Sequence, residues 1–132
     1  MLSLLKKKIK VIVEKTDTGF SAYAQDYPVF TTGNHFSNLL ENMVEAFNLY
    51  LEDDGHRIEP RNLNFEIDIK QFFQHYRVIN ARFLAERIGM NPTLLSQYVQ
   101  GRKKPSLQQT EKILKGIHQI GRELTELSLM SG

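Results

Sequence analysis

Apolar residues recur with two different periods along the chain, and the change of period separates a front half with strands from a helical back half. From residue 8 to 15 apolar side chains occupy every second position, which predicts a strand with one buried face. Asp17-Thr18-Gly19 predicts a turn in which the glycine takes a positive backbone angle. Residues 20–25 then predict the returning strand of a hairpin.

A third strand, a helix and a further strand complete the front half. Residues 29–32 predict a short strand, which cannot be central at its start because Pro28 lacks a donor. Gly33-Asn34 opens a helix, and the polar run 52–61 ends it and forms a loop. Residues 63–69 alternate cleanly and predict the last strand. The apolar residues expected on the sheet-facing side of the helix are Phe36, Leu40, Met43, Val44, Phe47 and Leu51.

The back half begins with a stretch that predicts two short helices joined by a tight turn. Asn80 caps the first helix, and Gly89 sits where a helix ends in the left-handed conformation. Asn91 caps the second helix and Pro92 takes its first position, while Gly101 ends it. This order of signals is the helix-turn-helix pattern, in which the second helix lies in the DNA major groove.

Candidate DNA-binding residues lie on the second helix and in the loop after it. Leu95 and Tyr98 form the apolar face of this helix, so short or planar polar side chains remain outside, where they can bind bases or phosphates. Three consecutive cations follow Gly101 and can meet a phosphate backbone. The candidates are Asn91, Thr93, Ser96, Gln97, Gln100, Arg102, Lys103 and Lys104. The alternative is a helical hairpin used only for packing.

Further helices are expected on both sides of this motif. Residues 71–78 predict a helix whose aromatic residues Phe72, Phe73 and Tyr76 help fill the small core of the motif. Ser106 and Gln109 form a capping-box start for a last helix. Its apolar stripe is longer than one small core needs and suits packing against a second copy. The residues expected to form a homodimer, or a higher homo-oligomer, are Ile117, Ile120, Leu124 and Leu127. Packing within the chain is the alternative for the first half of the stripe.

Charge differs sharply between the two halves. Residues 11–60 hold two cations against nine carboxylates, a net charge of −7, whereas residues 77–115 hold eight cations against two carboxylates, a net charge of +6. The overall charge of +2 conceals this asymmetry. It suggests a polyanionic partner for the back half and a cationic partner for the front half. A merely solvated acidic face is the alternative for the front.

Two family resemblances agree with this division. Residues 80–106 resemble the helix-turn-helix of phage-repressor-like (XRE) transcription regulators, including the Gly-Arg-Lys-Lys-Pro-Ser ending. Residues 9–53 look like the HicB antitoxins of bacterial HicA–HicB toxin–antitoxin pairs. The matching residues are Gly19-Phe20, Pro28, Phe30 to Asn34, Glu41-Asn42, Glu45 to Phe47 and Leu49 to Asp53.

The resemblance implies an α+β protein of two domains. Residues 1–69 would form a toxin-binding domain with a partial ribonuclease-H-like β-β-β-α-β fold, and residues 70–132 a helix-turn-helix domain for DNA binding and dimerisation. Such an antitoxin neutralises a small, basic, mRNA-cleaving HicA-like toxin and represses its own operon by binding operator DNA. The residues expected near the toxin are Asp26, Tyr27, Glu45 and Tyr50, although Tyr50 can equally belong to the core.

Two other function classes are open. A ligand-sensing transcriptional repressor without a toxin partner would need an enclosed pocket in the front domain. A metal-dependent nuclease with a DNA-targeting tail would need converging carboxylates, for which Glu14, Asp17 and Asp26 are the candidates. The four histidines stand alone, and neither a Gly-rich phosphate loop nor a nucleophile–base pair occurs. We therefore expect a non-enzyme without metal or cofactor.

The compartment follows from what the chain lacks. There is no cysteine, which excludes a disulfide framework and thiol-based metal sites. The basic, apolar start lacks the unbroken apolar core of a signal peptide, and no stretch approaches the roughly 18 apolar residues of a membrane span. These features predict a cytoplasmic protein.

Overall fold

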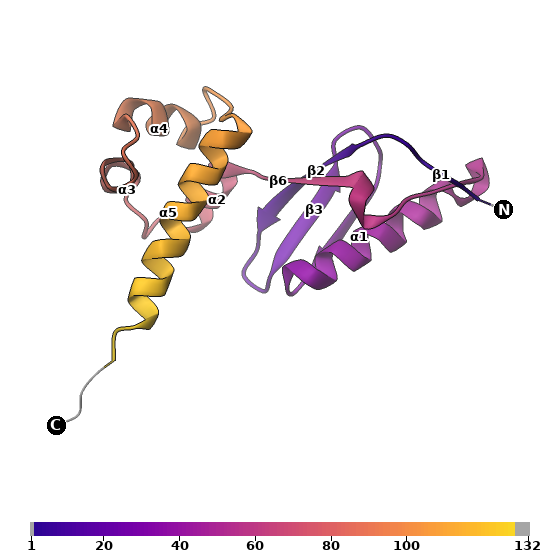
Figure 1. Ribbon diagram of the computed structural model, residues 1–132, viewed down its shortest axis with the longest axis horizontal. Helices are drawn as coiled ribbons and strands as arrows, with labels where there is room; N and C mark the ends of the chain where they lie inside the picture. The colour runs from indigo at the N-terminus through magenta and orange to yellow at the C-terminus, as the bar shows by residue number, and fades with distance from the viewer. Residues whose placement is uncertain (1, 129–132) are drawn as a thin grey trace. The chain divides into compact units, whose positions relative to one another are not determined.

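In the computed structural model, which describes residues 2–128, the strands lie in the front part of the chain and the back part is helical (Figure 1). One unit comprises Met1–His75 and a second comprises Tyr76–Gly132. All the strands of the described residues belong to the first unit, whereas the second contains helices alone. The predicted α+β class is therefore confirmed. The division falls after His75, six residues beyond the predicted boundary between residues 69 and 70.

A four-stranded sheet forms the frame of the first unit, in the order β4-β3-β2-β6. β2 (Ile9–Lys15) and β3 (Phe20–Ala24) form the predicted antiparallel hairpin, and β4 (Phe30–Gly33) pairs antiparallel with β3. β6 (Leu63–Ile67) lies parallel to β2. A parallel neighbour needs a crossover connection, and α1 (Phe36–Leu51) lies in the segment that brings the chain from β4 to β6.

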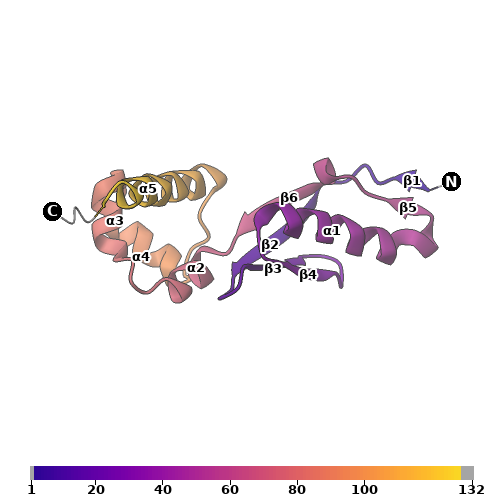
Figure 2. The same ribbon diagram turned by 90° about the horizontal axis from the view of Figure 1, so that it is seen from below.

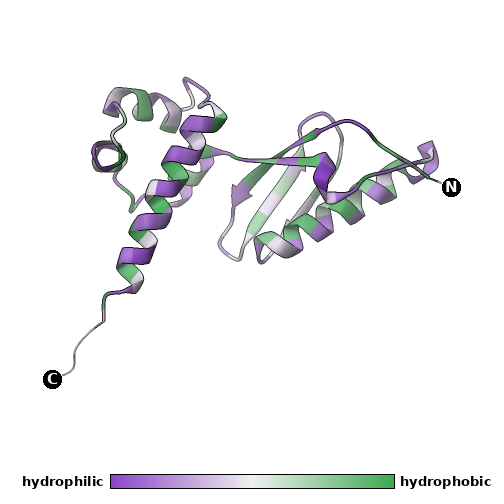
Figure 3. Cartoon of the chain, viewed as in Figure 1, coloured by the Kyte–Doolittle hydropathy of each residue, from purple (hydrophilic) through white to green (hydrophobic). Residues whose placement is uncertain are grey.

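α1 covers one face of this sheet, as Figure 2 shows. Leu39, Met43 and Phe47 are completely buried and pack with the strand residues of the core. The predicted apolar face was partly wrong, because Phe36 is 49% exposed and Leu40 is only partly buried. α1 contains adjacent apolar residues such as Leu39 and Leu40, so helical spacing allows two different apolar faces, and apolar and polar bands alternate along the helix (Figure 3). Packing on the sheet determines which of the two faces is buried.

Two glycines allow close approach of the hairpin, β4 and the start of α1. A Cβ on Gly19 would lie 2.2 Å from the carbonyl oxygen of Gly33, and one on Gly33 would lie 2.6 Å from the backbone nitrogen of Leu39. The φ angle of Gly19 is positive, at 159°, as the turn prediction expected. Backbone crowding is a second reason for glycine at this position, because a Cβ would have no room.

The polar run 52–61, predicted as a loop, contains regular structure. α1 passes into η1 (Glu52–Asp54), which ends at Gly55 with a left-handed φ of 74°. β5 (His56–Arg57) then pairs in parallel with β1 (Ser3–Leu4) as a separate two-stranded sheet. The short helix η2 (Pro60–Asn62) leads into β6.

Amide side chains hold this run in place, which explains how so polar a segment is ordered. Asn48 of α1 accepts a hydrogen bond from the Ile58 nitrogen at 2.7 Å and donates to the Ile58 oxygen at 3.4 Å. The buried Asn62 donates to the carbonyl oxygens of Leu5 at 2.7 Å and Lys7 at 3.1 Å. A buried amide of this kind is stable only when its donors are satisfied, so these bonds fix the N-terminal segment against η2.

The segment after β6 differs from the prediction of a strand to residue 69 and a helix over 71–78. α2 spans Ile69–His75 and begins where Asp68 accepts a hydrogen bond from the Gln71 nitrogen at 3.0 Å. The Gln71 side chain accepts from the Lys15 nitrogen at 2.8 Å and donates to the Lys15 oxygen at 2.7 Å. This paired contact with the end of β2 joins α2, with its buried Phe72 and Phe73, to the first unit.

The second unit contains α3 (Ala81–Ile88), α4 (Pro92–Val99) and α5 (Leu107–Thr125). The predicted N-caps are confirmed: the side chains of Asn80, Asn91 and Ser106 accept hydrogen bonds from amides of the first helical turns, at 3.0, 2.8 and 3.1 Å respectively. Gly89 ends α3 with a left-handed φ of 71°. These local signals place both ends of α3 and α4, and the start of α5, within a residue or two of the predicted positions.

Close packing of α5 on α3 organises the second unit. Leu84, Ala85, Leu95 and Ile113 are buried between the helices. Gly116 is buried where α5 meets α3, and a Cβ on it would lie 2.3 Å from Cγ2 of Ile88. The absence of a side chain at this position permits the contact.

Two glycines of α5 allow a test of this packing. Gly121 has no atom near its Cβ position, so Gly121→Ala should raise the free energy of unfolding by up to about 1 kcal/mol through helix propensity. Gly116→Ala gains the same propensity but overpacks against Ile88, which typically costs about 1–3 kcal/mol. Urea unfolding followed by circular dichroism should show Gly116→Ala less stable than Gly121→Ala by about 1–3 kcal/mol. Equal stabilisation by both substitutions would contradict the close approach.

Candidate nucleic-acid interface and protein-binding surfaces

α4 presents a polar stripe on the side away from the core. Leu95 and Tyr98 are buried, and at about 100° per residue the opposite side of the helix carries polar residues only. Thr93 and Gln100 are exposed, and Ser96 and Gln97 are partly exposed. The structure thus brings together four of the eight predicted DNA-binding residues.

Hydrogen bonds set the shape of this stripe. The side-chain nitrogen of Gln100 donates to the Ser96 hydroxyl at 3.1 Å, so these two side chains are oriented together. The carbonyl oxygen of Gln97 accepts from the backbone nitrogens of Arg102 at 2.9 Å and Lys103 at 3.3 Å. The loop after α4 is therefore folded back onto the end of the helix that carries the stripe.

A cationic loop continues the stripe. Gly101 has a left-handed φ of 75°, and Arg102, Lys103 and Lys104 follow it with exposed side chains. The backbone bonds to Gln97 keep the first two of these cations beside α4. Planar hydrogen-bonding groups next to cations have the chemistry required for base edges and phosphates.

Asn91 caps α4, and this structural role leaves fewer of its side-chain atoms for the predicted contact with DNA. Its side-chain oxygen accepts from the Thr93 nitrogen at 2.8 Å and the Leu94 nitrogen at 3.4 Å. That oxygen satisfies the free amides at the start of α4 and orients the helix. Only the amide nitrogen of Asn91 remains for a contact outside the chain.

The four predicted toxin-binding residues fall into two places. The Tyr27 ring packs edge-on against Phe47 at 5.3 Å and against Tyr50 at 6.2 Å, with the exposed Asp26 next to it. Glu45 is five residues before Tyr50, which places the two side chains roughly 140° apart around α1. The structure therefore joins Asp26, Tyr27 and Tyr50 but not Glu45.

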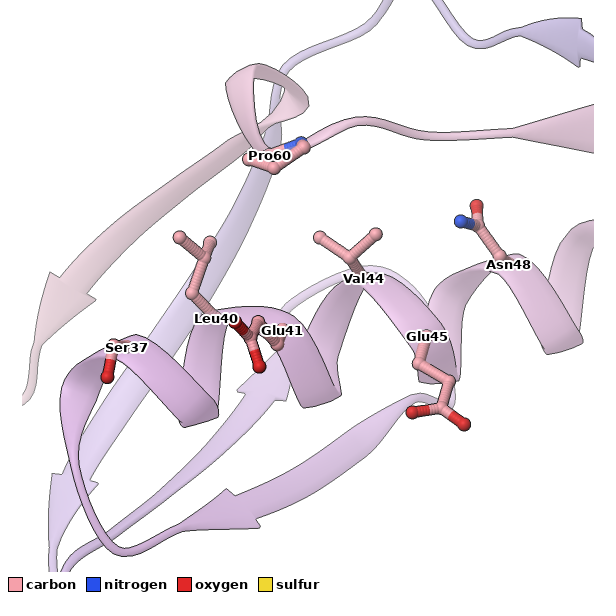
Figure 4. Close-up of a pocket in the computed structure, with 7 residues that line it drawn as sticks. All are labelled: Ser37, Leu40, Glu41, Val44, Glu45, Asn48 and Pro60. Atoms are coloured by element: carbon pink, nitrogen blue, oxygen red, sulfur yellow. The ribbon is translucent and has the colours of Figure 1, made fainter.

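Glu45 instead borders an open groove along α1. Leu40 and Val44 point toward Pro60, and the Glu45 carboxylate points away from them (Figure 4). The groove is open to solvent, whereas a ligand-sensing repressor would require an enclosed pocket. Its lining residues are Ser37, Leu40, Glu41, Val44, Glu45, Asn48 and Pro60.

The sheet face opposite α1 carries an apolar surface whose residues were not among the predicted site residues. Phe30, Tyr23 and Ile12 are cross-strand neighbours on β4, β3 and β2. Phe30 is 70% exposed and Tyr23 is 41% exposed. Partial burial, and then the negative charges of Glu14 and Asp68, raise the pKa of Tyr23 above its ordinary value. The sequence signal was present, because Ile12 and Tyr23 occupy the strand positions that α1 does not cover.

The predicted dimerisation residues become more exposed toward the end of the chain. Ile117 and Ile120 are partly buried, whereas Leu124 is 59% exposed and Leu127 is 75% exposed. An ion pair between Arg87 of α3 and Glu123 fixes this part of α5 against α3. The apolar stripe thus extends beyond the residues that α3 buries.

The candidate metal-binding carboxylates do not gather. The Asp17 side chain is 98% exposed, with the His75 ring nitrogen 3.9 Å away. Over residues 2–128, no group of three Asp, Glu or His side chains is arranged to hold a metal ion. None of the helices in the same range is both long enough and apolar enough to cross a membrane.

Comparison with known proteins identifies no relative of the chain. The chain matches no protein-family model, no curated protein and no solved structure.

Charge neutralisation tests the cationic loop. Replacing Lys103 and Lys104 by glutamine should weaken binding to any DNA duplex, because phosphate contacts are lost regardless of sequence. The slope of log K against log salt should become less steep by about two, since each phosphate contact contributes roughly 0.9. Fluorescence anisotropy with a labelled duplex at several salt concentrations measures the slope. Lys70→Gln in the first unit is the control, and an equal change there would remove the loop from the interface.

Proposed function

We propose that the chain is the antitoxin of a type II toxin–antitoxin pair and represses its own operon. Its second unit binds operator DNA as a homodimer, and its first unit binds and neutralises a small, basic, HicA-like mRNA-cleaving toxin. Both activities would take place in the bacterial cytoplasm. The polar stripe of α4 beside the cationic loop is the observation that carries this proposal.

Charge supports separate partners for the two units. The second unit holds nine cations and four carboxylates, a net charge of +5, which suits DNA. The first unit holds eight cations and eleven carboxylates, a net charge of −3, which suits a basic protein. A nucleic acid would be repelled by the first unit and attracted by the second.

DNA recognition would follow the helix-turn-helix mode, with α3 and α4 as its two helices. Gly89 and the Asn91 cap fix the turn between them, so the outward stripe of α4 can enter the major groove. Gln97 has the planar donor–acceptor group that reads adenine, and Ser96 and Thr93 can contact bases or phosphates. The cations after Gly101 would hold the adjacent phosphate backbone.

Operator binding would also require two copies of the chain to form a dimer. Leu124 lies near the end of α5 and Leu127 lies two residues after the helix; both are apolar and lie outside the core of their own unit. A two-fold contact there would present two α4 helices to two half-sites about one turn of DNA apart.

Toxin neutralisation would depend on the exclusion of RNA from the toxin. A ribonuclease-H-like first unit that covers the basic surface of the toxin would keep RNA from it, and opposite charges would speed the encounter. The family resemblance, not the comparisons, suggests this partner.

A substitution of Gln97, at the centre of the stripe, tests whether DNA binding and toxin neutralisation use separate surfaces. Gln97→Ala should weaken binding to the promoter region of the operon by about 5- to 150-fold, since a bidentate base contact contributes about 1–3 kcal/mol. Rescue of growth in cells that also express the small basic protein encoded next to this gene should remain. Gln119→Ala on the exposed side of α5 is the matched control and should alter neither. Loss of growth rescue together with DNA binding would contradict two separate surfaces.

A charge on the α5 stripe tests the dimer. Leu124→Glu should convert the dimer to a monomer, because paired carboxylates would face each other in an apolar contact. Leu107→Glu introduces the same charge at an equally exposed leucine near the start of α5 and should leave the dimer intact. Light scattering after gel filtration gives the mass of each variant. A monomeric wild-type protein would contradict the paired form.

A further inference from the structure

We propose that the uncovered face of the first unit's sheet is the docking surface for the basic protein partner, with Phe30, Tyr23 and Ile12 at its centre. The inference rests on the proposed antitoxin function and names the surface that performs it. It differs from the sequence expectation, which placed the contact at Asp26, Tyr27, Glu45 and Tyr50.

Strand register places the three apolar residues in one row. Phe30 pairs with Tyr23, and Tyr23 pairs with Ile12 across the sheet. Their neighbours along each strand, such as Val11, Val13 and Ala22, point to the opposite face and are buried in the core that α1 covers. The row is therefore presented outward by a sheet that is rigid on its other side.

The two aromatic side chains of the row are more exposed than is usual for aromatic residues. Phe30 is 70% exposed and Tyr23 is 41% exposed in the folded chain. Adjacent exposed aromatic residues on a rigid surface are typical anchors of protein–protein interfaces. Phe30 also lies on β4, an edge strand, so a partner can approach the row from the side as well as from above.

Carboxylates border the row and define the chemistry of the partner. Ile12 pairs with Glu66 on β6, and Glu14 and Asp68 are close enough to Tyr23 to raise its pKa. Lys10 offsets one of these charges through an ion pair with Glu66 at 3.5 Å. An apolar side chain flanked by lysine or arginine would fit, since cations bind both carboxylates and the faces of aromatic rings.

The same charges disfavour other occupants. A nucleic acid would bring phosphates against Glu14 and Asp68, which raises the electrostatic energy. A second copy of this chain would bring the same carboxylates toward each other across a two-fold axis. A basic protein is the occupant whose charge complements the surface.

The other two candidate surfaces of the first unit offer less to a partner. The Tyr27 ring is already engaged by Phe47 and Tyr50. In the groove along α1, Leu40 and Val44 are partly buried and point toward Pro60. Neither surface presents apolar side chains as accessible as Phe30.

Substitution of the two aromatic residues tests the surface. The double variant Phe30→Thr with Tyr23→Thr retains strand propensity while removing both rings. The probe is the purified basic protein encoded beside this gene, in a catalytically inactive form, and its affinity is measured by isothermal titration calorimetry. The dissociation constant should rise roughly 100-fold, as expected for loss of two interface anchors. Leu49→Ala removes a 67% exposed leucine from α1 and should change it less than about threefold, as for a residue outside the anchors.

A second variant removes charge without removing a ring. Glu14→Lys should slow association with the basic protein, and the effect should diminish as salt is added. DNA binding by the second unit reports that each variant is intact in that unit, and circular dichroism reports the fold of the first. If the double variant unfolds, unchanged association of Glu14→Lys at low salt overturns the inference.

The outcomes separate this inference from the proposed function. If the wild-type chain does not bind the basic protein, the proposed function fails and the docking surface fails with it. If the wild-type chain binds and the folded double variant binds equally well, only the docking surface is wrong. A change in oligomeric state with unchanged affinity would show that a second copy occupies the row, which also overturns the inference.

Discussion

A four-stranded sheet has two faces, and in the first unit α1 is the helix that covers one of them. Leu39, Met43 and Phe47 bury that face completely, and the glycines at positions 19 and 33 allow the hairpin and helix to approach closely enough. The helix cannot cover the opposite face as well. The row of Phe30, Tyr23 and Ile12 is therefore the consequence of the same packing that stabilises the unit, and it gives the proposed partner a place to bind.

In the second unit, core packing likewise determines which side of a helix is exposed. Leu95 and Tyr98 turn one side of α4 into the core, and the Asn91 cap fixes where the helix starts. The remaining side carries polar residues and is followed by a loop of cations, so core packing also determines which side chains are left for the proposed DNA contact. The two units also carry net charges of opposite sign, which suits the two different partners proposed for them.

Local signals made much of this fold predictable from the sequence. The caps at Asn80, Asn91 and Ser106 act through neighbouring amides, so reading a few residues was sufficient. Contacts between distant segments were not accessible in this way. The phase of α1, the crowding at Gly19, the pairing of β1 with β5 and the contact of Gln71 with Lys15 all depend on residues far apart in the chain. The polar stripe of α4 was predicted, whereas the aromatic row required the register of three strands.

If the two proposed surfaces are separate, one chain can hold DNA and a basic protein at the same time. Sedimentation velocity on a mixture of the chain, a duplex from its own promoter region and the inactive basic protein encoded beside its gene tests this directly. Separate surfaces should give a single complex that contains all three components and sediments faster than either binary complex. Release of the DNA as the basic protein binds, or failure of the basic protein to join the chain, would contradict it.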